Sequence, residues 1–298
     1  MTQLWSGRSG RVASGLRTRI TRSQFALRVA TGLVAAPILV LVIQAGGELL
    51  AALVALVLAA AIYELSAGMG LTRGDPVPWL AGAGVVAMTA VALTANIDPA
   101  WPLTAAALAV VAAPVLETLW TVRPADTESE FFAAIYRRSS TGIVGLLYVG
   151  WLGSYFILLR GLTSGTDWLL LAVFSVMATD TGAFAVGRLL GRHQLAPRIS
   201  PAKTVEGALG GIAGGFAAVL LIGLLLDPSV AIWKMVLLGL FLPVVSQIGD
   251  LAESALKRAL QVKDFSQLVP GHGGILDRLD SLLFGVPTVY FFVTWVVL

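Results

Sequence analysis

The sequence predicts an all-α, polytopic integral membrane protein with about nine transmembrane helices, and three observations support this prediction. The first is composition: 57% of the 298 residues are hydrophobic and only 12% are charged, whereas soluble domains average about 25% charged residues. The second is a series of long apolar runs, and the third is the alternation of basic and nearly uncharged connections between them. With a mean hydropathy of +0.86, the chain has too few charges to cover a soluble particle of this size.

The apolar runs are continuous and rich in Ala, Leu and Val. A helix rises about 1.5 Å per residue and a hydrocarbon core is about 30 Å thick, so each run can cross or nearly cross a bilayer. A transmembrane β-barrel would require strands of alternating hydrophobicity, and these runs do not alternate. The nine runs are residues 29–44, 48–65, 79–95, 102–122, 141–160, 168–186, 207–226, 231–249 and 281–298.

Basic residues predict the orientation of these helices. Of the 20 Lys and Arg residues, 18 fall in the N-terminal tail and in alternate connections, and only Arg160 and Lys234 lie near the opposite face. Because short cytoplasmic loops are enriched in Lys and Arg, we expect a cytoplasmic N-terminus. Residues 1–28 carry six arginines and no acid, which predicts a mobile cytoplasmic tail that lies against anionic headgroups. The net charge of +3 therefore reflects membrane topology and does not indicate nucleic acid as a partner.

Residues 29–298 are expected to form a single transmembrane catalytic domain. We find no internal repeat in them, so sequence symmetry does not support an inverted-repeat transporter. Two long cytoplasmic connections, 187–206 and 250–280, are rich in Gly, Pro, Asp, Lys and Arg, and we expect them to form the site. The chain has no cysteine and two histidines, which excludes disulfides, cysteine nucleophiles and His-rich zinc sites.

The 250–280 segment combines carboxylates, bases and a glycine-rich turn. One polar stripe follows a helix that continues the eighth apolar run, and it consists of Ser246, Asp250, Glu253 or Ser254, and Lys257. Asp277 and Asp280 share a helix face at the start of the ninth run. Between them, the residues at 270–274 read Pro-Gly-His-Gly-Gly, a turn whose backbone N–H groups can face an anion. Carboxylates beside Lys and Arg at a membrane surface indicate Mg²⁺ and a phosphorylated ligand.

A second polar segment begins inside the sixth apolar run. Asp180 lies within that run, where a carboxylate is costly unless it is paired or faces a hydrated cavity. Ser200 precedes Pro201 and is expected to cap the next helix, with Lys203 in its first turns. We therefore expect Asp180 and Lys203 to belong to the site.

Other polar residues are more typical of structural or surface positions. Glu64 and Glu117 lie near the ends of apolar runs, His193 lies in a basic loop, and Glu253 and Arg258 taken singly resemble solvated loop charges. Small residues let helices approach closely. The glycines expected to serve helix packing are Gly207, Gly210 and Gly211.

Two stretches of the chain resemble the signature of the phosphatidate cytidylyltransferase (CDP-diacylglycerol synthase) family. The first reads Ser254-x-x-Lys257-Arg258, Lys263-Asp264 and Pro270-Gly271-His272-Gly273-Gly274-Ile275-x-Asp277-Arg278-x-Asp280. The second reads Asp180-Thr181-Gly182-Ala183-Phe184-x-x-Gly187-Arg188-x-x-Gly191, then Ile199-Ser200-Pro201-x-Lys203-Thr204-x-Glu206-Gly207. The layout agrees, because the family is polytopic and carries its signature near the carboxyl end.

The resemblance implies a Mg²⁺-dependent nucleotidyltransferase of phospholipid biosynthesis that joins CTP to phosphatidic acid, giving CDP-diacylglycerol and pyrophosphate. It is expected in the plasma (inner) membrane, among membrane lipids, with a cytoplasmic active site; a second cation and a homodimer are open possibilities. The expected catalytic residues are Asp250, Lys257, Asp277 and Asp280, of which the three aspartates would hold the metal. The expected substrate-binding residues are Asp180, Ser200, Lys203, Arg258, Lys263, Gly271, His272, Gly273, Gly274 and Arg278.

Two alternatives stay open. A CTP-dependent polyprenol kinase would use similar metal and phosphate chemistry on another lipid, and CTP incorporation with phosphatidate or polyprenol separates the two. A cation transporter, from a different functional class, predicts ion flux without nucleotide and acids in the middle of its spans. Most acids of this chain are instead expected at the cytoplasmic edge, beside bases, which favours the enzyme.

Overall fold

The computed structural model describes residues 36–71, 74–94, 136, 138–226, 230–262, 265–266 and 274–298. Seven helices among them are long and apolar enough to cross a membrane, and they match seven of the nine predicted runs. The all-α, polytopic class is thereby confirmed. The predicted run 102–122 and the tail 1–28 lie outside the described residues, so the count of nine and the cytoplasmic N-terminus stay predictions.

The described elements are mostly helices. A short apolar helix, Ala36–Ala45, comes first. The long helices are α2 (Gly47–Gly68), α3 (Val77–Thr94), α6 (Leu152–Gly161), α7 (Gly165–Leu190), α8 (Val205–Leu226), α9 (Ile232–Ala259) and α10 (Leu276–Phe292). Two π-helical segments, η1 (Gly145–Trp151) and η2 (Val293–Val297), directly precede α6 and follow α10, and two strands, β1 (Gln194–Ala196) and β2 (Ser200–Thr204), lie between α7 and α8.

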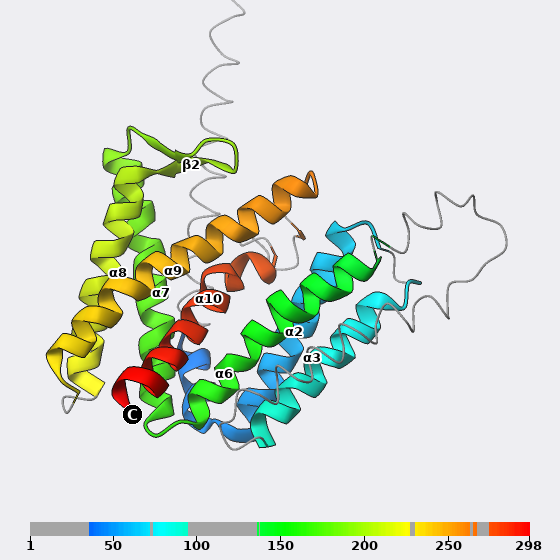
Figure 1. The fold of residues 1–298 in the computed structure, drawn as a ribbon, viewed down its shortest axis with the longest axis horizontal. Coiled ribbons are helices and arrows are strands. Elements are labelled where there is room, and N and C mark those ends of the chain that lie inside the picture. Colours follow the sequence, from blue (N-terminus) through cyan, green and yellow to red (C-terminus); the bar gives the residue numbers. More distant parts are fainter. Residues whose placement is uncertain are drawn as a thin grey trace, which may run out of the picture.

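The helices form two groups, with α2, α3 and α6 in one and α7, α8, α9 and α10 in the other (Figure 1). α10 joins the groups, because it contacts α6 as well as α7 and α9. Aromatic rings fill this junction: the Tyr155 ring of α6 lies 5.1 Å from that of Tyr290 and 5.2 Å from that of Phe291, between centroids. Tilted and edge-on aromatic pairs of this kind stabilise a packed interface.

Glycines bring α7 and α8 into close contact along their length. A Cβ at Gly182 of α7 would lie 2.7 Å from the Gly210 carbonyl oxygen, and one at Gly207 of α8 would lie 2.9 Å from the Ala183 carbonyl oxygen. A Cβ at Gly211 would lie 3.0 Å from the Ala183 Cβ. Because real Cβ atoms do not fit at such distances, the prediction that the α8 glycines serve helix packing is confirmed.

A two-stranded antiparallel hairpin replaces part of the helix expected after Pro201. Gln194 pairs with Thr204 and Ala196 with Ser200. The prediction that Ser200 caps α8 is wrong: α8 begins at Val205, and the Thr204 hydroxyl accepts the hydrogen bond from the Gly207 N–H at 3.1 Å. Proline favours extended backbone in the residue before it, which explains why the chain is extended at Ser200, where β2 begins.

The Glu206 carboxylate holds the base of this hairpin. It accepts hydrogen bonds from the backbone N–H groups of Arg192 and His193, at 3.0 and 3.2 Å. The His193 ring lies 2.6 Å away through Nδ1, so this histidine is exposed but has a defined partner. The hairpin is thereby anchored to the first turn of α8.

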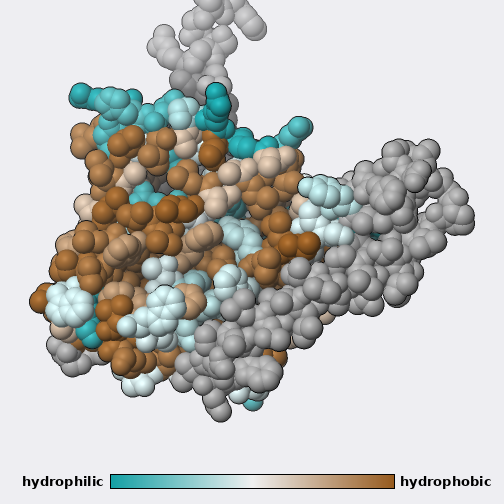
Figure 2. Space-filling model, in the orientation of Figure 1, coloured by the Kyte–Doolittle hydropathy of each residue, from teal (hydrophilic) through white to brown (hydrophobic). Residues whose placement is uncertain are grey.

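The surface is divided by polarity, as expected of a membrane protein. Figure 2 shows hydrophilic residues along the edge that carries the hairpin, and a broad hydrophobic face below it. Helix α8 contributes strongly to that face, since Leu209, Leu221 and Leu225 are each more than half exposed. Such contiguous exposed apolar surface is suited to lipid contact.

Candidate active site

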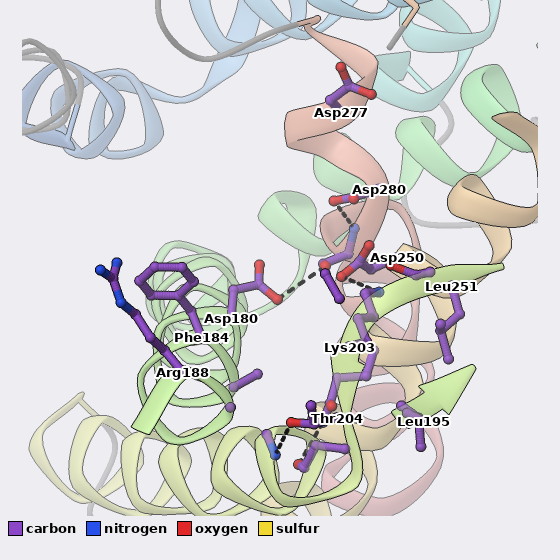
Figure 3. A pocket seen from close by; sticks show the side chains of 18 of the residues that line it. Asp180, Phe184, Arg188, Leu195, Lys203, Thr204, Asp250, Leu251, Asp277 and Asp280 are labelled. Atoms are coloured by element: carbon purple, nitrogen blue, oxygen red, sulfur yellow. Dashed lines mark hydrogen bonds and ion pairs between the residues drawn. The ribbon is translucent and has the colours of Figure 1, made fainter. Parts of the chain in front are cut away.

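A pocket of about 510 Å³ opens between α7, the hairpin, α9 and α10. Small-molecule sites typically measure about 300–1,000 Å³, so the volume suits a nucleotide-sized ligand. Figure 3 shows that acidic and basic side chains from all four elements gather around it. Its charged lining consists of Asp180 and Arg188 of α7, Lys203 of β2, Asp250 of α9, and Asp277, Arg278 and Asp280 of α10.

Three carboxylates, which we call the acid group, meet where α9 crosses α10. Asp250 and Glu253 lie one turn apart on α9 and face Asp280, and one oxygen of each residue lies within 4.8 Å of the others. Gly249 permits this approach, because a Cβ there would lie 2.7 Å from the Asp280 carbonyl oxygen. Adjacent carboxylates repel one another unless they share protons or a cation.

Glu253 is the most deeply placed member of the acid group. Its side chain is fully buried, and among the described residues no backbone N–H group or hydroxyl donates to its oxygens. Its partner is Lys257, whose Nζ lies 2.8 Å from Glu253 Oε2. A buried carboxylate with unused oxygen lone pairs, beside two further acids, has the donor set that Mg²⁺ requires.

Asp277 lies beside Glu253 at the edge of the acid group and is not one of its three members, although it was predicted to share a metal with Asp250 and Asp280. It stands nearer the start of α10 than Asp280 (Figure 3), where Lys257 Nζ donates to its Oδ1 at 2.9 Å. The Gly274 N–H donates to its other oxygen, also at 2.9 Å. Both oxygens therefore have partners within the chain, and the Gly274 N–H that we expected to face a phosphate is bonded to Asp277.

The opposite wall of the pocket is joined to α9 by one contact and to α10 by another. Lys203 Nζ of β2 lies 2.5 Å from Asp250 Oδ2, and the Ser281 hydroxyl donates to Asp180 Oδ1 at 3.3 Å. Asp180 thus faces the pocket from α7, as the cost of a carboxylate in an apolar run predicted. Strand β2 and α7 together bring two predicted site residues next to Asp250 and Asp280.

The remaining predicted residues differ in position. Ser200 and Arg278 line the pocket, whereas Arg258 donates from Nε to the Ile199 carbonyl oxygen at 3.0 Å and so ties α9 to the hairpin. Four predicted site residues lie outside the described part of the chain: Lys263, Gly271, His272 and Gly273.

Comparison with known proteins agrees with this geometry. A model described as the cytidylyltransferase family matches residues 26–296, which is nearly the whole chain. This chain belongs to the cytidylyltransferase family.

Curated relatives of this cytidylyltransferase-family chain carry a more specific name. It is 44% identical over 146 residues to the phosphatidate cytidylyltransferase of Bacillus subtilis, covering 49% of this chain and 54% of the relative. It is 41% identical over 145 residues to that of Staphylococcus saprophyticus, covering 49% and 55%. With that of Synechocystis sp. it shares 40% identity over 185 residues, covering 52% and 61%. The chain thus spans little more than half the length of these relatives.

Sequence reasoning missed two residues of this cytidylyltransferase-family site. Glu253 was a candidate for the polar stripe with Asp250 and Lys257 but, taken singly, was expected to be a solvated charge; its spacing of three residues from Asp250 and four from Lys257 places all three on one helix face. Arg188 lines the pocket, with its guanidinium carbon 5.9 Å from the centre of the Phe184 ring. Arg188 follows Asp180 by two turns of the same helix, and this spacing was the sequence feature that could have indicated its place at the site.

Proposed function

We propose that this protein transfers the cytidylyl group of CTP to phosphatidate. The observation that carries the proposal is the acid group of Asp250, Glu253 and Asp280, which lies beside basic side chains at a pocket built from membrane helices. Its relatives from Bacillus subtilis and Staphylococcus saprophyticus are named phosphatidate cytidylyltransferases, which supports the choice of substrates.

The proposed reaction is a displacement at phosphorus. An oxygen of the lipid phosphate forms a bond to the α-phosphorus of CTP. The bond from that phosphorus to the oxygen bridging it to the β-phosphorus breaks, and pyrophosphate leaves with the bonding electrons. Phosphatidate is already an anion near neutral pH, so the main obstacle is repulsion between two phosphate groups. Fixed positive charge at the site removes that obstacle.

Asp250, Glu253 and Asp280 would hold Mg²⁺, because they supply the hard oxygen ligands that this ion prefers. When bound, Mg²⁺ would neutralise phosphate charge and stabilise the charge on the leaving pyrophosphate. A second cation nearby stays part of the proposal. The burial of Glu253 beside Asp250 and Asp280, with Lys257 as its counter-ion among the described residues, supports a cation at this place.

The basic residues divide into two kinds. Lys257 is held between Glu253 and Asp277 and keeps a positive charge beside the acid group. Asp277 therefore acts in our proposal by orienting Lys257. Lys203, Arg188 and Arg278 face the pocket and would bind the phosphates of CTP and of the lipid, since guanidinium and ammonium groups bind phosphate by charge-assisted hydrogen bonds.

The membrane-spanning helices explain the choice of a lipid substrate. The acyl chains would stay in the bilayer while the phosphate enters the pocket from its polar edge. We propose that this edge faces the cytoplasm of a plasma (inner) membrane, as the distribution of basic residues predicts. A homodimer, suggested by the family resemblance, also stays a proposal.

Labelled CTP tests the proposed reaction and separates it from its nearest rival. The purified protein is supplied with phosphatidate or a polyprenol in mixed micelles, and with CTP labelled in either the α- or the γ-phosphate. Cytidylyl transfer predicts α-label, and no γ-label, in a lipid product that forms only with phosphatidate and disappears with EDTA. Gamma-label in a polyprenol product would instead identify a lipid kinase. Ion flux in liposomes without nucleotide would identify a transporter.

A further inference from the structure

Glu64 is a buried carboxylate that belongs to α2, outside the helices that form the pocket. Its side chain is 1% exposed, although it lies within an apolar helix of the other helix group. Burying a charge in this way is costly unless donors surround it. The donors that contact the Glu64 carboxylate therefore indicate which part of the protein this charge stabilises.

Among the described residues, the hydrogen bonds to Glu64 come from the segment that leads into α10. Its Oε1 accepts from the Ser266 hydroxyl at 2.5 Å and from the Ile275 N–H at 3.0 Å. Its Oε2 accepts from the Leu276 N–H at 3.0 Å. One carboxylate oxygen thus joins the residues on either side of the stretch 267–274, which contains the Pro-Gly-His-Gly-Gly sequence.

The surroundings are shaped to fit this carboxylate. A Cβ at Gly274 would lie 2.7 Å from Glu64 Oε2 and 3.1 Å from Asp277 Oδ2, so a side chain there would displace one carboxylate or the other. Gly68, one turn further along α2, leaves room for the Phe265 ring, which would lie 2.6 Å from a Cβ. The end of α2 is therefore a docking face for this segment.

A continuous set of contacts leads from Glu64 to the acid group. Glu64 fixes the Ile275 and Leu276 N–H groups, at the start of α10. Gly274, next to them, donates to Asp277, which binds Lys257, and Lys257 pairs with Glu253. The first N–H groups of a helix have no partner within it, and a negative charge is favoured there. Glu64 meets both requirements and also orients the helix that carries Asp277 and Asp280.

We propose that Glu64 is a positioning residue for cytidylyl transfer. It holds both ends of the glycine-rich stretch and the start of α10, so that Asp277, Lys257 and the acid group keep their arrangement. This inference rests on the proposed function. It assigns Glu64 no contact with substrate, so its loss should lower kcat and leave the KM values for CTP and phosphatidate nearly unchanged.

The test compares Glu64→Gln and Glu64→Ala with Ser66→Ala. Ser66 is a suitable control, because it is equally buried on the same helix and, within the described part of the chain, its hydroxyl bonds to the Ile62 carbonyl oxygen alone, at 2.8 Å. Steady-state kinetics give kcat and KM, and hydrogen–deuterium exchange of peptides that begin at least two residues before residue 275 and cover residues 275 and 276 reports on the Ile275 and Leu276 amides. Circular dichroism and size-exclusion chromatography show whether each variant is folded.

Removal of one charged hydrogen-bonding group typically costs about 10-fold or more. We expect kcat to fall at least about 10-fold in Glu64→Ala and less in Glu64→Gln, which keeps one acceptor oxygen. The KM values should stay within about threefold, and exchange at residues 275 and 276 should accelerate. Ser66→Ala should change none of these quantities by more than about twofold.

Three results would overturn the inference: kcat close to that of Ser66→Ala, unchanged exchange at residues 275 and 276, or failure of both Glu64 variants to fold when Ser66→Ala folds. The last result would mean that Glu64 serves the fold rather than the site. Failure of the proposed function is distinct, because the wild-type protein would then make no CDP-diacylglycerol while the exchange measurement would still report the Glu64 contact.

Discussion

Lys257 of α9 donates a hydrogen bond to Asp277 of α10 at 2.9 Å, and this pair holds Asp277 at the edge of the acid group, beside Glu253. The same ammonium lies 2.8 Å from Glu253. Asp280, which follows Asp277 on α10, instead approaches Asp250 and Glu253. Two aspartates that look equivalent in sequence thus have different partners, and the difference can be measured.

Asp277→Asn and Asp280→Asn should affect magnesium dependence differently. Both substitutions should lower kcat by about 100-fold or more, because each alters a buried charged contact. Only Asp280→Asn should also raise the Mg²⁺ concentration required for half-maximal activity, since only Asp280 belongs to the acid group. Titration of activity with Mg²⁺ measures this quantity. An equal increase in both variants would place Asp277 on the metal and contradict our assignment.

Glu253→Gln should remove most of the activity and raise the Mg²⁺ concentration required for half-maximal activity, although this residue resembles a solvated charge in the sequence. An amide is a poorer ligand for a divalent cation than a carboxylate. We expect at least about a 100-fold loss of kcat. Glu48→Gln is a matched control, because Glu48 is an exposed acid in the first turn of α2, far from the pocket. Equal activity of the two variants would exclude Glu253 from the site.

Lys257→Met should destabilise the protein as well as inactivate it. It leaves the carboxylates of Glu253 and Asp277 without their shared cation, and breaking a buried ion pair typically costs about 3–5 kcal/mol. Thermal unfolding in detergent measures the effect. Addition of Glu253→Gln to Lys257→Met should recover part of the lost thermal unfolding midpoint, because it removes one of the uncompensated charges. A double variant less stable than Lys257→Met would contradict the pairing.

Gly182→Ala should destabilise the protein, whereas Gly82→Ala should not. A Cβ at Gly182 would lie 2.7 Å from the Gly210 carbonyl oxygen, so α7 and α8 would have to separate, while a Cβ at Gly82 meets nothing within 4 Å. Overpacking typically costs about 1–3 kcal/mol, but alanine in an open helix position is favoured by up to about 1 kcal/mol. Thermal unfolding of the two variants should shift in opposite directions; equal shifts would contradict close packing of α7 against α8.

The sequence was sufficient to predict the helices and the two segments that form the site. Long apolar runs indicate spans because a bilayer requires about 20 apolar residues, and seven runs agree with described helices. Asp180, Lys203, Asp250 and Asp280 were expected to meet, because charges in or beside apolar runs need a polar site. The structure places all four at one pocket.

Three features depended on tertiary packing that spacing alone does not determine. Glu253 is buried next to Asp280 where α9 packs against α10. Asp277 and Asp280 are one turn apart, yet the rise along the helix brings Asp277 to Lys257 and Asp280 to Asp250. Glu64 was expected to be structural, and its donors lie more than 200 residues away in the chain. No local pattern predicts such a contact.

The most direct test of the central claim is anomalous diffraction from crystals of the protein soaked with Mn²⁺ in place of Mg²⁺. We predict a peak between α9 and α10, at about 2.0–2.5 Å from carboxylate oxygens of Asp250, Glu253 and Asp280. The peak should be lost in Asp280→Asn and kept in Asp277→Asn. A peak bound to Asp277 and remote from Glu253, or no peak at these helices in crystals that bind Mn²⁺ elsewhere, would contradict the account.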